Sequence, residues 1–168
     1  MGWYGNRSSQ GWSPGGTIIA NSDTFDERNL TKAGYTENPL ADGSLAGYTL
    51  YEIPMTSLTK EAVVPLGVKP RDADRSKNFF ALGLVSWMYT RPVDPTLQWI
   101  NERFAKTPQV ADANTAAFKA GHAFGETAEL FDHPYHVKPM VLPAGTYTNI
   151  TGNVALAWGI VAAGQLAK

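Results

Sequence analysis

One stretch of the chain, residues 74–91, constrains the fold more than any other. Read as a helix, it carries apolar side chains on nearly every side. Two adjacent ridges hold them, with Phe79, Leu82, Val85 and Tyr89 on one and Phe80, Leu84, Trp87 and Met88 on the next. A helix that is apolar all round must be covered all round, either inside a domain or between subunits. Gly83 weakens such a helix by about 1 kcal/mol relative to alanine, so we predict that another backbone passes close to it. The chain is therefore expected to be a piece of a larger assembly.

Composition excludes several classes of protein. The 168 residues are 43% hydrophobic and 17% charged, with a net charge of −1, which is typical of a globular protein. Near-neutral charge without a basic block argues against nucleic acid as the main partner. No apolar run approaches the roughly 18 residues of a membrane span, and no signal peptide is visible, so we expect a cytoplasmic protein that does not bind membranes. The absence of cysteine excludes disulfides and a Cys-ligated iron–sulfur cluster within this chain.

The first half of the chain alternates strands and helices. Residues 1–12 mix Gly, Ser, Asn and Trp without a period and are predicted to be an irregular tail. Residues 17–20 are short, β-branched and apolar, which favours a buried strand, and residues 48–53 are predicted to be a second strand. A short helix over 25–33, closed by Gly34, is predicted between them, and a helix over 58–64, capped by Thr56 or Ser57, after them. This order favours a parallel sheet with helices on its faces.

The second half is predicted to be helical. After the apolar helix over 75–89, two helices are expected to begin at a capping residue followed by proline, namely Asp94 with Pro95 and Thr107 with Pro108. A proline-rich extended linker follows. A last helix over 154–167, rich in Ala and Gly, is suited to close packing.

Several segments in the same order resemble a known family. Pro14-Gly-Gly-Thr-Ile-Ile-Ala-Asn-Ser22, Tyr51-Glu-Ile-Pro-Met-Thr56 and Asn78-Phe-Phe-Ala-Leu-Gly-Leu84 resemble the gamma-type domain of 2-oxoacid:ferredoxin oxidoreductases. Asn149-Ile-Thr-Gly-Asn-Val-Ala-Leu-Ala-Trp-Gly159 resembles the start of the pyrimidine-binding domain of the same alpha subunit. The order of the segments is that of the 2-oxoglutarate type of alpha subunit.

The resemblance implies a domain plan and a fold class. Residues 13–131 correspond to the C-terminal part of the gamma-type domain, 132–147 to a linker, and 148–168 to the truncated start of the pyrimidine-binding domain. The fold class is then α/β, with part of a Rossmann-like gamma domain containing a parallel sheet, followed by helices and the first helix of a second α/β domain. The family's earlier strands and its segment that approaches the thiamine diphosphate have no counterpart in this sequence, so the chain is expected to be a fragment.

The resemblance also implies a function. The parent reaction is oxidative decarboxylation of a 2-oxoacid, 2-oxoglutarate in this branch, to an acyl-coenzyme A with electrons passing to ferredoxin. Thiamine diphosphate, magnesium, an iron–sulfur cluster and coenzyme A are implied for the complex, and none is expected within this chain. A beta subunit and, through the complex, ferredoxin are the implied partners. No position here matches a catalytic residue of the family, so the chain is expected to supply scaffold and subunit contacts and to be inactive alone.

Polar residues follow both predicted strands. Asn21, Ser22 and Asp23 follow the first strand, and Thr56 and Ser57 follow the second. Ligands of doubly wound sheets gather at the carboxyl ends of strands, and a helix start offers free N–H groups to an anion. Asn21, Ser22, Thr56 and Ser57 are therefore candidate contacts for coenzyme A or another anion. The simpler interpretation is that they form turns and helix caps.

Two further groups of polar residues are weaker candidates. Asp132, His133 and His136 lie close in sequence, but residues three apart in an extended chain point to opposite sides, so no metal site is predicted. Glu126 and Glu129, with Asp132, lack a partner base or nucleophile and are expected to be a solvated helix end.

Two other functions remain open at this level. The first is the same enzyme class acting on pyruvate or a branched-chain 2-oxoacid, which substrate assays on the complex would decide. The second is a non-catalytic α/β binding or assembly module. A co-purifying thiamine-type beta subunit would favour the enzyme, and a stable monomer without a partner would favour the module.

Overall fold

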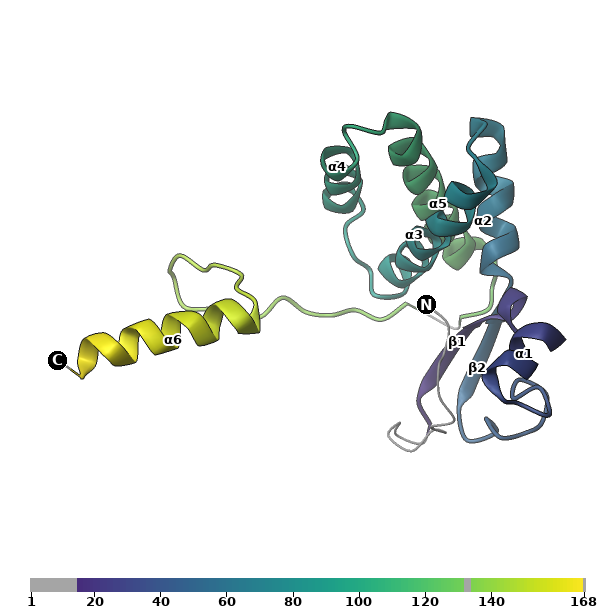
Figure 1. Cartoon of the computed structure of the whole chain (residues 1–168), viewed down its shortest axis with the longest axis horizontal. Coiled ribbons are helices and arrows are strands. Elements are labelled where there is room, and N and C mark those ends of the chain that lie inside the picture. Colours follow the sequence, from purple (N-terminus) through teal and green to yellow (C-terminus); the bar gives the residue numbers. More distant parts are fainter. Residues whose placement is uncertain (1–14, 132–133, 168) are drawn as a thin grey trace. The chain divides into compact units, whose positions relative to one another are not determined.

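The computed structural model describes residues 15–131 and 134–167, which divide into two compact units (Figure 1). The first unit extends to Val137 and the second begins at Lys138. The predicted irregular tail, residues 1–12, lies outside the described residues. Each unit is considered by itself below.

A two-stranded parallel sheet opens the first unit. Strand β1 (Thr17–Asn21) pairs with β2 (Thr49–Ile53), with Thr17 opposite Thr49 and Asn21 opposite Ile53. The crossover between them holds a short 3₁₀ turn, η1 (Ser22–Thr24), and helix α1 (Glu27–Ala33). Parallel strands need such a crossover because a tight turn cannot join them. The predicted α/β class and parallel pairing are confirmed.

Helix α1 carries its own start and stop signals. The Asp26 carboxylate accepts a hydrogen bond from the N–H of Asn29 at 2.9 Å and so caps the first turn. Gly34 ends the helix in the left-handed region, with φ of 82°. The sequence prediction of a short helix closed by Gly34 is confirmed.

Helix α2 (Met55–Val63) begins three residues earlier than predicted. Pro54 occupies the N-cap position, and neither Thr56 nor Ser57 caps the helix with its side chain. The predicted cap is wrong because Thr56 and Ser57 lie within the first turn, where their own N–H groups need acceptors. A 3₁₀ turn, η2 (Val64–Leu66), follows α2 and ends at Gly67.

Helices α3 (Pro70–Met88) and α5 (Pro108–Thr127) pack closely against each other. A Cβ atom placed on Gly83 of α3 would overlap the backbone carbonyl of Phe118, and one placed on Gly121 of α5 would overlap the carbonyl of Phe80. The prediction of a second backbone beside Gly83 is therefore confirmed.

Helix α4 (Asp94–Arg103) lies between α3 and α5 in the sequence. Asp94, the cap predicted for this helix, is instead its first residue, with Val93 at the N-cap position. Thr107 does stand at the N-cap position of α5, yet its hydroxyl donates to the carbonyl of Phe104 at 3.4 Å instead of capping α5. Proline in the first turn serves both helices without a side-chain cap, because its missing N–H would have no partner there.

The core of the first unit lies where α3 and α5 meet the sheet and α2. Its fully buried side chains include Ile53, Val63, Phe80 and Leu84. The outer ridge of α3 is only partly covered. Leu82, Val85 and Tyr89 are each 41% exposed, whereas Phe79 packs against the rings of Trp99 and Phe104. Within the described residues, the apolar helix predicted from the sequence is thus buried on one side and partly exposed on the other.

The second unit contains an extended segment and helix α6 (Gly152–Leu166), which begins two residues before the predicted start. The Thr151 hydroxyl accepts a hydrogen bond from the N–H of Val154 at 3.4 Å. The helix carries no charged residue, and its large apolar side chains are exposed, including Leu156 and Trp158. No helix in the described part of the chain combines the length and apolarity needed to cross a bilayer.

Candidate functional site

The carboxyl ends of β1 and β2 bring four polar residues together. Asn21 is the last residue of β1, and Asp23 follows it in η1. Thr56 and Ser57 lie in the first turn of α2, directly after β2. Because the two strands are parallel, their carboxyl ends meet at the same edge of the sheet. The sequence prediction placed these residues at one edge, and the structure confirms this. We call these four residues the strand-end cluster.

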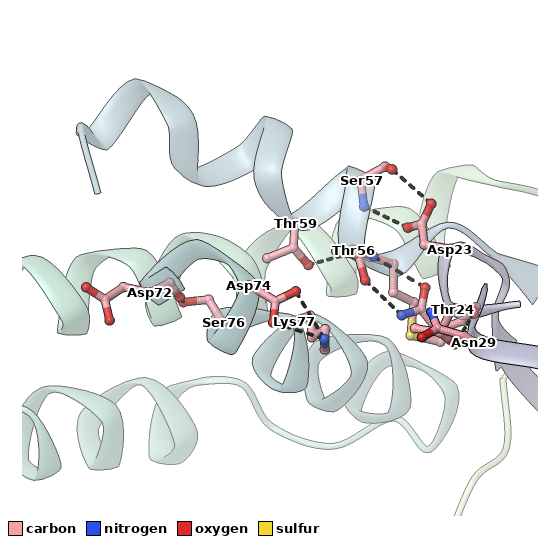
Figure 2. Close-up of polar contacts among 12 residues, drawn as sticks. Asp23, Thr24, Asn29, Thr56, Ser57, Thr59, Asp72, Asp74, Ser76 and Lys77 are labelled. Carbon is pink, nitrogen blue, oxygen red and sulfur yellow. Dashed lines mark hydrogen bonds and ion pairs between the residues drawn. The ribbon is translucent and has the colours of Figure 1, made fainter. Parts of the chain in front are cut away.

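Two pairs of hydrogen bonds join the strand-end cluster. The Asn21 Nδ2 group donates to Thr56 Oγ1 at 2.8 Å, and the Thr56 N–H donates to Asn21 Oδ1 at 3.4 Å. The Ser57 N–H donates to Asp23 Oδ2 at 2.8 Å, and the Ser57 hydroxyl donates to Asp23 Oδ1 at 2.9 Å. Figure 2 shows both contacts between Asp23 and Ser57 as dashed lines.

Asp23 therefore caps α2 from a different part of the chain. The first N–H groups of a helix have no acceptor inside the helix, and a negative charge near them is favoured by the helix dipole. Asn21 and Asp23 supply these acceptors from 35 and 34 residues away in the sequence. The arrangement fixes the start of α2 against the end of β1.

Ser22 takes no part in these four bonds. Its carbonyl oxygen accepts from the N–H of Phe25 at 3.1 Å within the 3₁₀ turn. Of the four candidate contacts predicted from the sequence, Asn21, Thr56 and Ser57 come together and Ser22 stands beside them. Asp23 has a larger structural role than Ser22, and its one signal in the sequence is an acidic residue two positions after the end of a strand.

The chemistry available at the strand-end cluster is binding rather than bond breaking. A general acid–base step needs a base within hydrogen-bonding reach of a nucleophile or a substrate proton. Asp23 is held by the helix start and a hydroxyl, and no histidine, lysine or cysteine belongs to the cluster. An anion arriving here would meet a carboxylate already bonded to the Ser57 N–H. Neutral polar groups could still contact the exposed Ser57.

The other polar candidates do not gather into a site in the described residues. Across residues 15–131 and 134–167, no three His, Cys, Asp or Glu side chains lie close enough to hold a metal ion. Asp132 and His133 lie outside the described residues. Glu126 and Glu129 are exposed at the end of α5, as expected for a solvated helix end.

A shallow hollow of about 260 Å³ lies in the loop before β2. Its lining is mostly apolar and consists of Pro39, Leu40, Ala41, Gly43, Leu45, Ala46, Tyr48 and Leu50. The loop enters β2 at the amino end of the strand, so the hollow is not part of the strand-end cluster.

Comparison with known proteins identifies the family. Residues 4–124 match the sequence pattern described as pyruvate ferredoxin/flavodoxin oxidoreductase. The chain belongs to this family. The match includes the parallel sheet, the strand-end cluster and the α3–α5 pair.

A curated relative is similar over nearly the whole chain. It is the 2-oxoglutarate oxidoreductase subunit KorA of Mycobacterium tuberculosis (strain ATCC 25618 / H37Rv), 51% identical over 153 residues. The aligned region is 91% of this chain and 23% of the relative, so the chain spans about a quarter of the length of that protein. No solved structure matches the chain.

Proposed function

We propose that the chain is part of the alpha subunit of a 2-oxoglutarate:ferredoxin oxidoreductase. This enzyme would convert a 2-oxoacid to an acyl-coenzyme A by oxidative decarboxylation and pass the electrons to ferredoxin. The observation that carries the proposal is the 51% identity over 153 residues to a 2-oxoglutarate oxidoreductase subunit. The family match over residues 4–124 supports the same class of reaction.

In this complex the chain would supply scaffold and subunit contacts. The two backbones of the α3–α5 pair approach closely at Gly83 and Gly121. The exposed apolar side chains of α3 and α6 are suited to burial against other polypeptide, since apolar contact area drives association. A beta subunit is the proposed partner, with ferredoxin reached through the complex in the cytoplasm.

The domain plan is part of the proposal. Residues 13–131 would be the C-terminal part of a gamma-type domain, 132–147 a linker, and 148–168 the start of a pyrimidine-binding domain. The division of the structure after Val137 falls within the proposed linker.

The cofactors would be held elsewhere in the complex. Thiamine diphosphate, when bound, supplies the carbanion chemistry of such enzymes, and protein supplies binding and orientation. This chain has no cysteine for a Cys-ligated iron–sulfur cluster, and its described carboxylates do not form a set that fits magnesium and a diphosphate. The described residues therefore would act by holding other elements in place.

Coenzyme A is the one cofactor for which this chain offers a candidate contact. We assign it to the strand-end cluster together with Ser22. Asp23 already occupies the N–H group of Ser57, and its charge would repel a phosphate. The contact would thus be with the neutral, amide-containing pantetheine arm, through the exposed Ser57.

Two substitutions test the coenzyme A contact in the assembled enzyme. Ser57→Ala should raise the KM for coenzyme A several-fold and leave the KM for the oxoacid unchanged. Asp23→Asn should change the KM for coenzyme A little if pantetheine binds here, and lower it if a phosphate does. Ser44→Ala, which alters an exposed loop hydroxyl, is the matched control. An unchanged KM for coenzyme A in Ser57→Ala would remove the assignment.

The enzyme proposal itself is tested by a substrate panel. The full-length subunit would be purified with the proteins that accompany it and assayed for coenzyme A-dependent reduction of ferredoxin. We expect 2-oxoglutarate to give the highest kcat/KM among 2-oxoglutarate, pyruvate and branched-chain 2-oxoacids. The family description favours pyruvate as the second candidate. The 168-residue chain alone should be inactive, and turnover by it would contradict the scaffold role.

A further inference from the structure

The C-terminal end of α3 has an uncommon backbone. Thr90 lies in the left-handed region, with φ of 49°. Its N–H donates to the carbonyl of Trp87 at 3.0 Å, and the N–H of Arg91 donates to the carbonyl of Ser86 at 2.8 Å. These two bonds define a helix ending in which glycine usually occupies the left-handed position. A β-branched residue is rare there because its side chain crowds the backbone.

The same helix end has a carbonyl that the helix cannot satisfy. The carbonyl of Met88 would accept from the residue four positions later, but that residue is Pro92, which has no N–H. The N–H of Tyr135 donates to this carbonyl at 2.5 Å. The Met88 carbonyl, which has no partner within the helix, thus accepts a hydrogen bond from the segment that follows α5.

Thr90 forms a second hydrogen bond with Tyr135. Its hydroxyl donates to the carbonyl of Tyr135 at 2.9 Å. The rings of Tyr89 and Tyr135 are stacked, with centroids 5.4 Å apart and planes inclined by 24°. Met88, Tyr89 and Thr90 therefore contact the N–H, the ring and the carbonyl of Tyr135 in turn.

We propose that this contact, the Thr90–Tyr135 clamp, is a conformational device that sets where the segment leading to the second unit leaves the first. Glycine at position 90 would end the helix without strain but would carry no hydroxyl. The presence of threonine is explained by its bond to Tyr135. The clamp holds one residue through an exposed hydroxyl bond and two rings that are 41% and 47% exposed. Such a contact opens without unfolding α3 and α5.

Opening the clamp would free more of the segment that leads from the first unit to the second. Among the described residues, Phe131 is held on the α5 side of Tyr135, with its ring 4.5 Å from that of Tyr51 and 5.7 Å from that of Trp87. Release of Tyr135 would therefore leave the ring contacts of Phe131 to hold the segment on the side of α5. The closed clamp shortens the free part of this segment, and the open clamp extends it.

Limited proteolysis of the full chain with chymotrypsin tests the clamp. The enzyme cleaves after Tyr135, whose carbonyl is the one held by Thr90, and after the exposed Tyr147 of the second unit, which serves as an internal reference. Mass spectrometry would give the ratio of the two cleavage rates for wild type, Thr90→Ala, Thr90→Ser and Thr107→Ala. Thr107→Ala is the matched control, since it also removes a helix-end hydroxyl bonded to a carbonyl.

The expected result is selective exposure of Tyr135. Thr90→Ala should raise the cleavage ratio about five- to tenfold, the effect of losing one hydrogen bond. Thr90→Ser, which keeps the hydroxyl, and Thr107→Ala should stay within about twofold of wild type. An unchanged ratio in Thr90→Ala would overturn the proposal. A parallel rise in cleavage after Tyr51, at the sheet, would also overturn it, because the helix pair would then be unfolding with the clamp.

Discussion

The contact between α3 and α5 leads to a quantitative prediction for Gly83→Ala. The added methyl group would overlap the backbone carbonyl of Phe118 and approach the N–H of His122. Both obstacles are backbone atoms of a helix, so no rotation of a side chain can relieve the overlap. The two helices would have to move apart along their whole contact.

The magnitude of the destabilisation follows from one stabilising and two destabilising terms. Alanine stabilises a helix interior by about 1 kcal/mol relative to glycine. Overpacking a well-packed core costs about 1–3 kcal/mol. Moving α3 from α5 also loosens Phe80 and Leu84, which are fully buried in one core cluster with Ala113 and Ala117 of α5. Loss of such packing costs about 2–5 kcal/mol when it leaves a cavity. Partial relaxation brings the expected net destabilisation to about 3 kcal/mol.

The assay is urea unfolding of the full chain, followed by circular dichroism and by tryptophan fluorescence. Gly121→Ala should destabilise as strongly as Gly83→Ala, because its Cβ would overlap the Phe80 carbonyl. Gly125→Ala should be milder, since the obstacle there is the side chain of Trp87. Gly164→Ala is the control, because its Cβ meets nothing within 4 Å, and it should leave the midpoint unchanged or raise helicity slightly.

The double variant tests whether one contact is responsible. Once α3 and α5 have separated, the second methyl group has room, so Gly83→Ala with Gly121→Ala should destabilise less than the sum of the two single changes. A midpoint for Gly83→Ala equal to or above that of wild type would refute the close approach of the two backbones.

Three other changes have defined outcomes. Asp23→Ala removes the cap of α2 and should destabilise the first unit by about 1 kcal/mol, measured by urea unfolding. Ser76→Ala leaves the buried amide oxygen of Asn114 without the hydroxyl that donates to it at 2.8 Å, and should cost about 1–3 kcal/mol in the same assay. Hydrogen bonds from Ser44, first its side chain and then its backbone, hold the pKa of Asp42 below its usual value. A lowered pKa means that these bonds stabilise the loop above the unfolded-state pKa of Asp42 and are lost as the pH falls through the folded-state value. Ser44→Ala should raise that pKa in an NMR titration, and an unchanged pKa would contradict this cause.

Much of the fold could be predicted from the spacing of apolar residues and from the glycines and prolines at the ends of elements. The predicted bounds of the two strands and of the helix closed by Gly34 lie within two residues of the observed ones, and the long apolar helix begins five residues before its predicted start. Gly83 even predicts a neighbouring backbone, since a glycine in the middle of an apolar helix costs stability unless a close approach requires it. Helix starts were less accurate. Thr56, Ser57 and Asp94 look like caps by residue type, but the caps observed depend on which acceptors lie nearby in space.

In the strand-end cluster, too, one part could be predicted from the sequence and another could not. Parallel strands alone predict that residues 21–23 and 56–57 meet at one edge. The bond between Asp23 and Ser57 could not be predicted, because it joins residues 34 positions apart whose distance depends on the twist and register of the sheet.

Sequence by itself determined the order of elements, their hydrophobic faces and the family, because these depend on residue types and spacings within single segments. The tertiary structure alone decided that Phe118 and Phe80 are the backbones beside Gly83 and Gly121, that Asp23 caps α2, and that Tyr135 fills the acceptor left open by Pro92. Each of these contacts joins groups from distant segments, and hydrogen bonds and close packing depend on distances of a few tenths of an ångström. Such distances are fixed only when the whole core has packed.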